Sequence, residues 1–135
     1  MRPPISRESQ YSRVVTHRAP LSHRVKGISK VYYSASAPFE THLAEPLAPL
    51  LKALIEKGSY THLFAGHTAV GRDTIPRVAA LVDSSQVSDI IEVQGEDTFV
   101  RPIYAGNALA TVKTGDKVKV ITVRGTAFEA AATEG

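Results

Sequence analysis

The sequence has 135 residues, room for one domain, and 43% of them are hydrophobic, enough for a packed core. It contains no cysteine, which excludes disulfides, thiolate metal sites and cysteine nucleophiles. No apolar run approaches the ~20 residues of a membrane-spanning helix, so we expect no membrane insertion. The net charge of +3 is unevenly distributed, because residues 1–30 carry seven Lys/Arg and one acid and the remainder is mildly acidic.

Residues 1–27 form a basic tail without sustained helix or strand periodicity, and we expect this tail to be disordered. Its five arginines, several serines and single acid match the composition of a mitochondrial transit peptide. An unselected segment, produced by a wrong start site or splice junction, explains the same composition equally well. The basic residues lack aromatic neighbours other than Tyr11, which argues against specific nucleic-acid binding.

The first regular elements after the tail are a strand and a helix. Residues 29–34 are rich in β-branched and aromatic side chains, which predicts a short strand. A helix is predicted over residues 44–57, because a set of leucines shares one face of a 3.6-residue period. These leucines are Leu43, Leu47, Leu50, Leu51 and Leu54. Pro46 and Pro49 are expected in the first turn, where the missing N–H groups would have no partner.

A second strand and a second helix follow. Residues 61–66 are apolar and end in glycine, which predicts a buried parallel strand. The helix after them ends near Val82, but its start has two alternatives. Either Thr68 caps it and Pro76 kinks its interior, or Asp73 caps it and Pro76 lies in the first turn.

Beyond residue 88 the hydrophobic period changes from 3.6 to 2. This change predicts four strands, at residues 89–93, 98–104, 109–113 and 117–123. Gly106-Asn107 and Gly115-Asp116 are two-residue turn signals, which favour hairpins between consecutive strands. The order of elements predicts an α/β fold in which antiparallel strands extend a parallel sheet at its C-terminal end.

The turn between the apolar strand and the second helix, residues 66–72, is the first place to look for a binding site. Free N–H groups and the helix dipole at such a turn can hold an anion. The spacing matches neither GxGxxG nor GxxxxGK[ST]. We therefore favour the alternative that the glycines allow close packing of the strand on the helix.

Metal and nucleophile chemistry have little support in the sequence. Its histidines show no metal-ligand spacing within one element, so we expect no metal site. They are His17, His23, His42, His62 and His67. No GxSxG motif and no interpretable acid–histidine pair occurs, so we assign no catalytic residue.

Three arginines stand beside or within apolar segments. Arg77 lies beside the apolar face of the second helix, and Arg101 and Arg124 interrupt predicted strands. Each side chain either points to solvent or contacts a partner subunit or domain through paired hydrogen bonds to a carboxylate. The three are therefore our candidate interface residues.

Several short segments of this sequence occur in the same order in one known family. They are Ala65-Gly66, Pro76-Arg77-Val78-Ala79-Ala80, Asp97-Thr98-Phe99-Val100-Arg101, Tyr104-Ala105-Gly106-Asn107-Ala108-Leu109 and Val123-Arg124-Gly125-Thr126. In these segments the chain resembles the first domain of the electron transfer flavoprotein alpha subunit. The resemblance covers residues 25–133, about four fifths of the chain.

The resemblance implies an incomplete Rossmann-like fold of the adenine nucleotide hydrolase type. In this family an alpha and a beta subunit form a heterodimer with one FAD in the mitochondrial matrix or in bacteria. The heterodimer carries electrons from acyl-CoA dehydrogenases to a membrane quinone oxidoreductase during fatty acid β-oxidation. The resemblance also implies a structural or beta-subunit interface role for the three arginines, and an electron-transfer role in place of an enzymatic one. It implies no FAD-binding residue here, because the family's FAD domain follows this one.

The resemblance also divides the chain. Residues 28–129 are expected to form a partial alpha-subunit domain, and residues 130–135 to begin an interdomain linker. Because the basic tail replaces the family's first strand–helix–strand–helix segment, we expect the chain alone to be marginally stable. Two alternative hypotheses stay open, a stand-alone nucleotide-binding regulatory module and an inert truncation product.

Overall fold

The computed structural model describes residues 11–15, 28–34, 36–39 and 41–132. The chain divides into two compact units. One unit comprises Met1–Glu40 together with Ala130–Gly135, and the other comprises Thr41–Glu129.

The first unit contains a pair of parallel strands. β1 (Tyr11–Val15) pairs with β2 (Ile28–Tyr33), and the register shifts between Tyr11 and Ser12. A short 3₁₀ turn, η2 (Ala37–Phe39), follows β2. The structure confirms the strand predicted at residues 29–34, with bounds one residue earlier.

The expectation of a tail without strands is wrong at β1. Tyr11, Val14 and Val15 have high strand propensity, and the backbone of β1 gains hydrogen-bonding partners on β2. Residues 1–10 and 16–27 lie outside the described part of the chain. The disorder of the tail and its targeting function therefore stay predictions.

The second unit begins with α1 (Ala44–Gly58), close to its predicted bounds. Its buried side chains are Ala44, Leu47, Ala48 and Ile55. Leu50, Leu51 and Leu54 of the predicted face are half-buried, so the structure confirms that face in part and adds Ala48 and Ile55 to it. The small Ala48 side chain packs in one cluster with α2, and small residues on this face allow close helix approach. Leu43 precedes the helix as its N-cap and is 54% exposed, so it does not belong to the buried face. Pro49 lies inside the helix and not in its first turn.

The second helix, α2 (Ala69–Leu81), resolves the alternative about its start. The Thr68 hydroxyl accepts a hydrogen bond of 3.2 Å from the Gly71 N–H, so Thr68 is the N-cap. Pro76 consequently lies in the helix interior. Among the described helices, none is both long and apolar enough to cross a membrane.

A three-stranded parallel sheet lies at the centre of this unit. It consists of β3 (His62–Gly66), β8 (Lys119–Val123) and β4 (Gln86–Ile90), in the order β3-β8-β4. The hairpin predicted at Gly115-Asp116 is wrong, because β8 pairs in parallel with β3 and β4 and not with the strand before it. Val120 and Ile121 of β8 are both 0% exposed and belong to different core clusters, as expected of a central strand buried on both faces.

A three-stranded antiparallel sheet completes the unit. It contains β5 (Glu92–Val93), β6 (Thr98–Ile103) and β7 (Ala108–Lys113). β6 and β7 form the hairpin predicted at Gly106-Asn107, and η3 (Tyr104–Gly106) lies at its tip. The predicted strand 89–93 is divided between the end of β4 and β5. The predicted α/β class, with a parallel and an antiparallel part, is confirmed.

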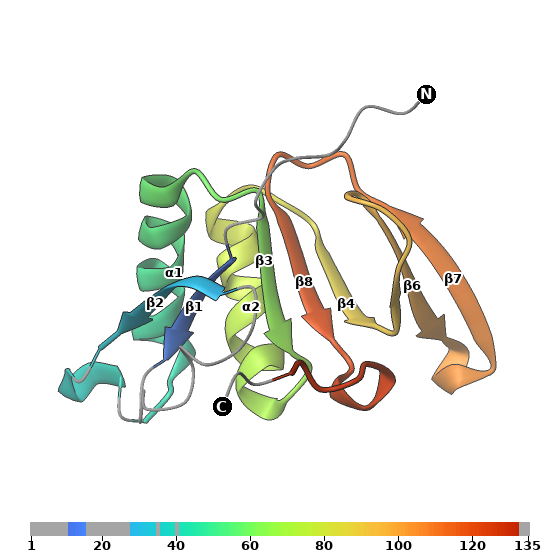
Figure 1. Ribbon diagram of the computed structural model, residues 1–135, viewed down its shortest axis with the longest axis horizontal. Helices are drawn as coiled ribbons and strands as arrows, with labels where there is room; N and C mark the ends of the chain where they lie inside the picture. Colours follow the sequence, from blue (N-terminus) through green and yellow to red (C-terminus); the bar gives the residue numbers. More distant parts are fainter. Residues whose placement is uncertain (1–10, 16–27, 35, 40, 133–135) are drawn as a thin grey trace. The chain divides into compact units, whose positions relative to one another are not determined.

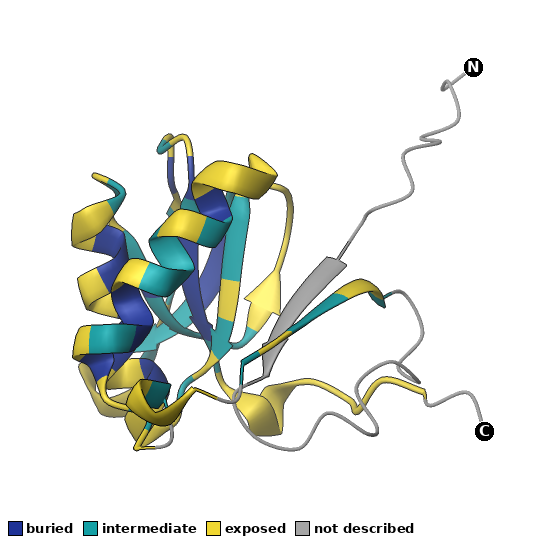
Figure 2. Cartoon of the chain, turned by 90° about the vertical axis from the view of Figure 1, so that its left-hand side faces the viewer, coloured by how far each residue is buried: buried dark blue, intermediate teal, exposed yellow. Residues whose placement is uncertain are grey.

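Two apolar clusters hold the layers of this unit together. The first contains Ile75 and Val78 of α2 with Val120 of β8, on the helix side of the parallel sheet. The second contains Ile90, Phe99 and Ile121, between the parallel sheet and the β6–β7 hairpin. Figure 1 shows α1 and α2 side by side, followed by β3, β8, β4 and the hairpin. In Figure 2 the buried positions lie where the helices and the sheet face each other.

Candidate functional site

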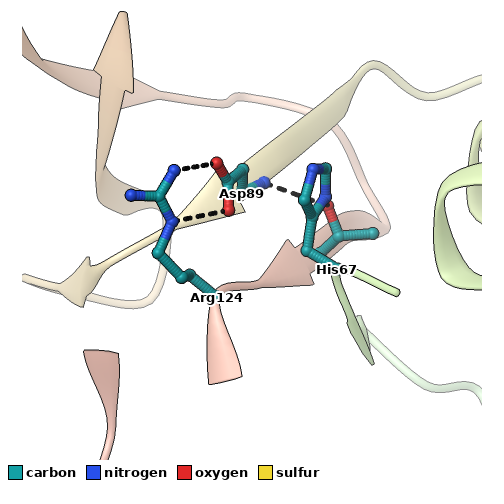
Figure 3. Close-up of polar contacts among 4 residues, drawn as sticks. His67, Asp89 and Arg124 are labelled. Carbon is teal, nitrogen blue, oxygen red and sulfur yellow. Dashed lines mark hydrogen bonds and ion pairs between the residues drawn. The ribbon is translucent and has the colours of Figure 1, made fainter. Parts of the chain in front are cut away.

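Polar side chains of the second unit meet at the carboxyl ends of its parallel strands. His67 follows β3, Asp89 belongs to β4, and Arg124 follows β8. Figure 3 shows the three side chains close together, with Arg124 and His67 on opposite sides of Asp89. Open α/β sheets bind ligands at this edge, so it is the place to test for a site.

Asp89 and Arg124 form a bidentate ion pair. The Arg124 Nε donates to Asp89 Oδ1 over 3.0 Å, and the Nη2 group donates to Asp89 Oδ2. The backbone supports the pair, because the Arg124 N–H donates to the Ile90 carbonyl over 2.9 Å. Asp89 has a φ of 59°, a left-handed conformation at the register irregularity between β4 and β8. The pair therefore fixes an irregular strand end to the segment that leaves β8.

Thr122 connects this pair to His67. The Asp89 N–H donates to the Thr122 hydroxyl oxygen over 3.0 Å, and His67 Nδ1 lies 3.0 Å from the same oxygen. The His67 backbone N–H donates to the Val123 carbonyl over 2.8 Å. Thr122 is completely buried, so the network runs from the packed sheet edge out to the exposed Arg124 side chain.

The electrostatics of the site keep the carboxylate of Asp89 ionised. The hydrogen bond from Arg124 is the largest cause that holds the pKa of Asp89 below its ordinary value. Burial acts in the opposite direction, and the electrostatic influence of the nearby His67, Arg124 and Arg101 lowers the pKa further. The same hydrogen bond raises the pKa of Arg124. Each carboxylate oxygen of Asp89 accepts a hydrogen bond from Arg124, so the pair holds this carboxylate in a fixed orientation.

The turn from residue 66 to residue 72 favours the packing interpretation over anion binding. Gly71 is buried, and a Cβ atom on it would overlap the carbonyl oxygen of Gly66. The Thr68 hydroxyl already accepts from the Gly71 N–H, and the Thr68 carbonyl accepts from the Arg72 N–H over 2.9 Å. Two donors near the helix start are therefore engaged within the chain.

The histidines do not assemble a metal site in the described part of the chain, where no group of three potential ligands occurs. His62 Nε2 lies 2.6 Å from the Glu96 carbonyl oxygen, and its Nδ1 lies 2.8 Å from the Thr61 hydroxyl. His67 contacts Thr122. His17 and His23 lie outside the described residues.

The three candidate interface arginines have different environments. Arg77 Nη2 lies 3.1 Å from Glu45 Oε1, an exposed ion pair between α2 and α1. Arg124 is paired with Asp89. Arg101 forms no side-chain ion pair or hydrogen bond with another described residue, and its Nε atom is buried. Two of the three therefore have intramolecular partners.

The sequence did not indicate the cluster of Asp89, Thr122 and His67. The sequence predicts Asp89 within an ordinary strand, and His67 as part of the 66–72 turn or as an unsupported metal ligand. Residues at the ends of neighbouring parallel strands are the signal for such a cluster. That signal requires the position of β8 in the sheet, and the predicted β7–β8 hairpin gave the wrong position.

Comparisons with known proteins agree with the fold. The family model described as "Electron transfer flavoprotein domain" matches residues 15–135. A relative from Cryptococcus neoformans, named a probable mitochondrial electron transfer flavoprotein subunit alpha, is 50% identical over 111 residues, 80% of this chain and 32% of the relative. An electron transfer flavoprotein subunit alpha from Pseudomonas aeruginosa is 50% identical over 112 residues, 83% of this chain and 36% of the relative.

A third relative, from Schizosaccharomyces pombe, is also named a probable mitochondrial alpha subunit. It is 42% identical over 111 residues, 82% of this chain and 33% of the relative. The chain thus spans about a third of the length of the curated relatives it matches. The chain belongs to the electron transfer flavoprotein domain family, and the relatives that it resembles are alpha subunits of that electron-transfer protein.

Proposed function

We propose that this chain provides a scaffold domain of an electron transfer flavoprotein alpha subunit, packs against a beta subunit and helps to hold the flavin domain. The complete heterodimer would carry electrons from acyl-CoA dehydrogenases to a quinone oxidoreductase in the mitochondrial matrix, as part of fatty acid oxidation. The mitochondrial naming of the fungal relatives supports this location.

The observation that carries the scaffold role is the closed state of the sheet edge. Asp89, the acid at that edge, has both oxygens bonded to Arg124. The adjacent Gly71 packs against the Gly66 carbonyl, which holds the start of α2 close to the end of β3. A domain with this edge is suited to holding neighbouring polypeptides and not to chemistry at its own strand ends.

The turn at this edge lacks the glycine spacing of a dinucleotide-binding loop. A dinucleotide pyrophosphate needs free backbone N–H groups at the first turn of the helix after the strand. Here the N–H groups of Gly71 and Arg72 donate to Thr68. We therefore derive no electron-transfer step through these residues, and we assign FAD binding to the flavin domain of the full-length family. The same geometry disfavours the stand-alone nucleotide-binding module.

Co-expression of the tagged chain with the beta subunit from the same genome tests this proposal. The expected result is a complex that survives affinity purification and gel filtration without flavin absorbance. A folded chain that elutes without the beta subunit would contradict the scaffold role. A chain that alone retains flavin through gel filtration would contradict the assignment of FAD to another domain.

A further inference from the structure

The strand β7 is the longest edge strand among those described in the second unit. In the described part of the chain it pairs with β6 alone, and the other edge of the same sheet is β5, which has only 2 residues. Figure 1 shows β7 as the outermost strand on the side of this unit away from the helices. β7 has no proline and no bulge, and its only charged residue is its last, Lys113. Apart from that lysine, it lacks the features by which edge strands avoid pairing with other chains.

The hydrogen bonds of the hairpin show which backbone groups of β7 point outward. The Thr114 N–H donates to the Asp97 carbonyl over 2.9 Å, so residue 114 belongs to a hydrogen-bonded pair. Such pairs alternate along an antiparallel ladder, so Val112, Ala110 and Ala108 bond to β6. The backbone N–H and C=O groups of the residues between them point away from β6. These residues are Leu109, Thr111 and Lys113.

Two observations on β6 support this alternation. Pro102 has no N–H group and lies opposite Leu109, where the alternation requires no hydrogen bond. The Val100 carbonyl accepts from the Ile91 N–H over 2.8 Å, so Val100, which is opposite Thr111, directs its carbonyl away from β7. Each outward residue of β7 therefore offers one donor and one acceptor at the outer edge of the sheet.

The side chains at this edge have the properties of a contact surface. Exposed and half-buried residues alternate along β7, with Leu109 64% exposed. Tyr104, in the turn η3 next to β7, is 78% exposed, and tyrosine is enriched in protein interfaces. Lys113 Nζ lies 3.3 Å from Asp97 Oδ2, but the lysine side chain is 72% exposed and has three donors. Lys113 can therefore bind a second carboxylate.

We propose that an extended segment of the beta subunit adds to the outer edge of β7 as a further β-strand. This inference rests on the proposed function, because it takes the beta subunit as the partner. Main-chain hydrogen bonds would hold the segment, and its alternate side chains would lie beside those of β7. The matching segment has an apolar side chain beside Leu109 and an acidic one beside Lys113. A second copy of β7 matches less well, because this strand contains no acidic residue.

The first experiment measures binding of the full chain to the beta subunit by isothermal titration. Thr111→Pro removes an outward N–H group, and the proline ring occupies the outer edge, so binding should weaken about tenfold or more. Thr111→Val is the matched control, because it keeps the N–H group and the strand propensity, and it should bind as the unsubstituted chain does. Equal weakening by both variants would assign the contact to the threonine side chain and overturn the inference.

Thermal unfolding shows whether the proline variant keeps the fold. Proline is tolerated on an edge strand where the replaced N–H group faces solvent, so the midpoint of Thr111→Pro should stay close to that of the unsubstituted chain. Val112→Pro removes a donor to β6 and should lower the midpoint much further. Equal lowering by the two proline variants would show that the Thr111 N–H does not point outward, and the inference would fall.

Amide hydrogen exchange of the unsubstituted chain gives a readout without any substitution. In the free chain the amides of Ala110 and Val112 should exchange slowly, and those of Thr111 and Lys113 rapidly. With saturating beta subunit the amides of Thr111 and Lys113 should become protected. Rapid exchange of both amides in the complex would overturn the inference.

The outcomes separate this inference from the proposed function. Unchanged binding of Thr111→Pro would overturn the inference and leave the scaffold role intact. Failure of the unsubstituted chain to bind the beta subunit would overturn both. Normal binding of Thr111→Pro to the beta subunit, together with loss of self-association in sedimentation velocity, would make a second copy the occupant of the edge and also overturn it.

Discussion

Arg124 donates two parallel hydrogen bonds to the carboxylate of Asp89, and the two residues are 35 positions apart in the sequence. Asp89 lies at an irregular end of β4, and Arg124 is the first residue after β8. The pair thus joins the ends of two neighbouring parallel strands at the point where the chain leaves the sheet. A planar guanidinium group holds a carboxylate in a fixed orientation, which a lysine could not do.

The first prediction concerns stability at acid pH. The pKa of Asp89 is lowered in the folded chain, mainly by the hydrogen bond from Arg124. A carboxyl group with a lowered folded pKa stabilises the fold fully above its ordinary pKa of 3.8, and this contribution is lost as the pH falls through the folded value. Asp89→Asn should therefore lower the free energy of unfolding at neutral pH and flatten the acid limb of the stability curve.

Urea unfolding between pH 7 and pH 2 measures this limb. Arg124→Gln should flatten it in the same way, because it removes the main cause of the lowered pKa of Asp89. Asp73→Asn, a change of an exposed carboxylate on α2, is the control. Its acid limb should be as steep as that of the unsubstituted chain. An acid limb of Asp89→Asn as steep as that of the unsubstituted chain would contradict the prediction.

The second prediction concerns the close approach of β3 to α2. In Gly71→Ala the added methyl group would overlap the carbonyl oxygen of Gly66, so the helix must move away from the strand. Overpacking of this kind destabilises proteins by ~1–3 kcal/mol, more than the gain in helix propensity. Gly125→Ala is the matched control, since its Cβ would have no atom within 4 Å. Equal unfolding midpoints in urea for the two variants would show the packing role of Gly71 to be wrong.

The third prediction compares two phenylalanines in edge-to-face contact. The rings of Phe64 and Phe99 have centroids 6.5 Å apart, but Phe99 is completely buried and Phe64 is 45% exposed. Phe99→Ala should cost about 3–5 kcal/mol, enough to unfold a marginal domain. Phe64→Ala should cost roughly 1 kcal/mol, because about half of its surface is already in water. Circular dichroism of both variants during urea titration would decide, and similar losses would contradict the burial difference.

The fourth prediction follows from the edge of the parallel sheet. Among the described strands, β3 pairs with β8 alone, and Phe64 presents an exposed ring on β3. An unprotected edge strand favours association between chains. Sedimentation velocity should show the purified chain self-associating as its concentration rises, and Phe64→Glu should shift it toward monomer. A monodisperse monomer with a sharp unfolding transition would contradict both this prediction and the expected marginal stability.

Local patterns were sufficient for part of the fold. The apolar run at residues 61–66 predicted β3, which begins one residue later, and the predicted end of α2 near Val82 is confirmed. The start of α2 stayed open, because Thr68 and Asp73 are equally good caps until the Thr68–Gly71 hydrogen bond is known.

Pairing between distant strands was beyond those patterns. β8 follows β7 after a turn signal, yet it pairs with β3 and β4. Val120 and Ile121 point to opposite faces of β8 and are both completely buried, which a central strand of the parallel sheet allows. The ion pair could not be predicted for the same reason, since Asp89 and Arg124 become neighbours only through the pairing of β4 with β8. The outward direction of the Thr111 N–H group likewise depends on the register that places Ala110 opposite Arg101.

The central claim is that this domain serves as a scaffold for a beta subunit and not as a ligand site. Isothermal titration of the purified chain with the beta subunit, and in the same cell with AMP, tests this claim most directly. The account predicts saturable one-to-one binding of the beta subunit and no heat from AMP. Saturable AMP binding by a chain that does not bind the beta subunit would contradict it.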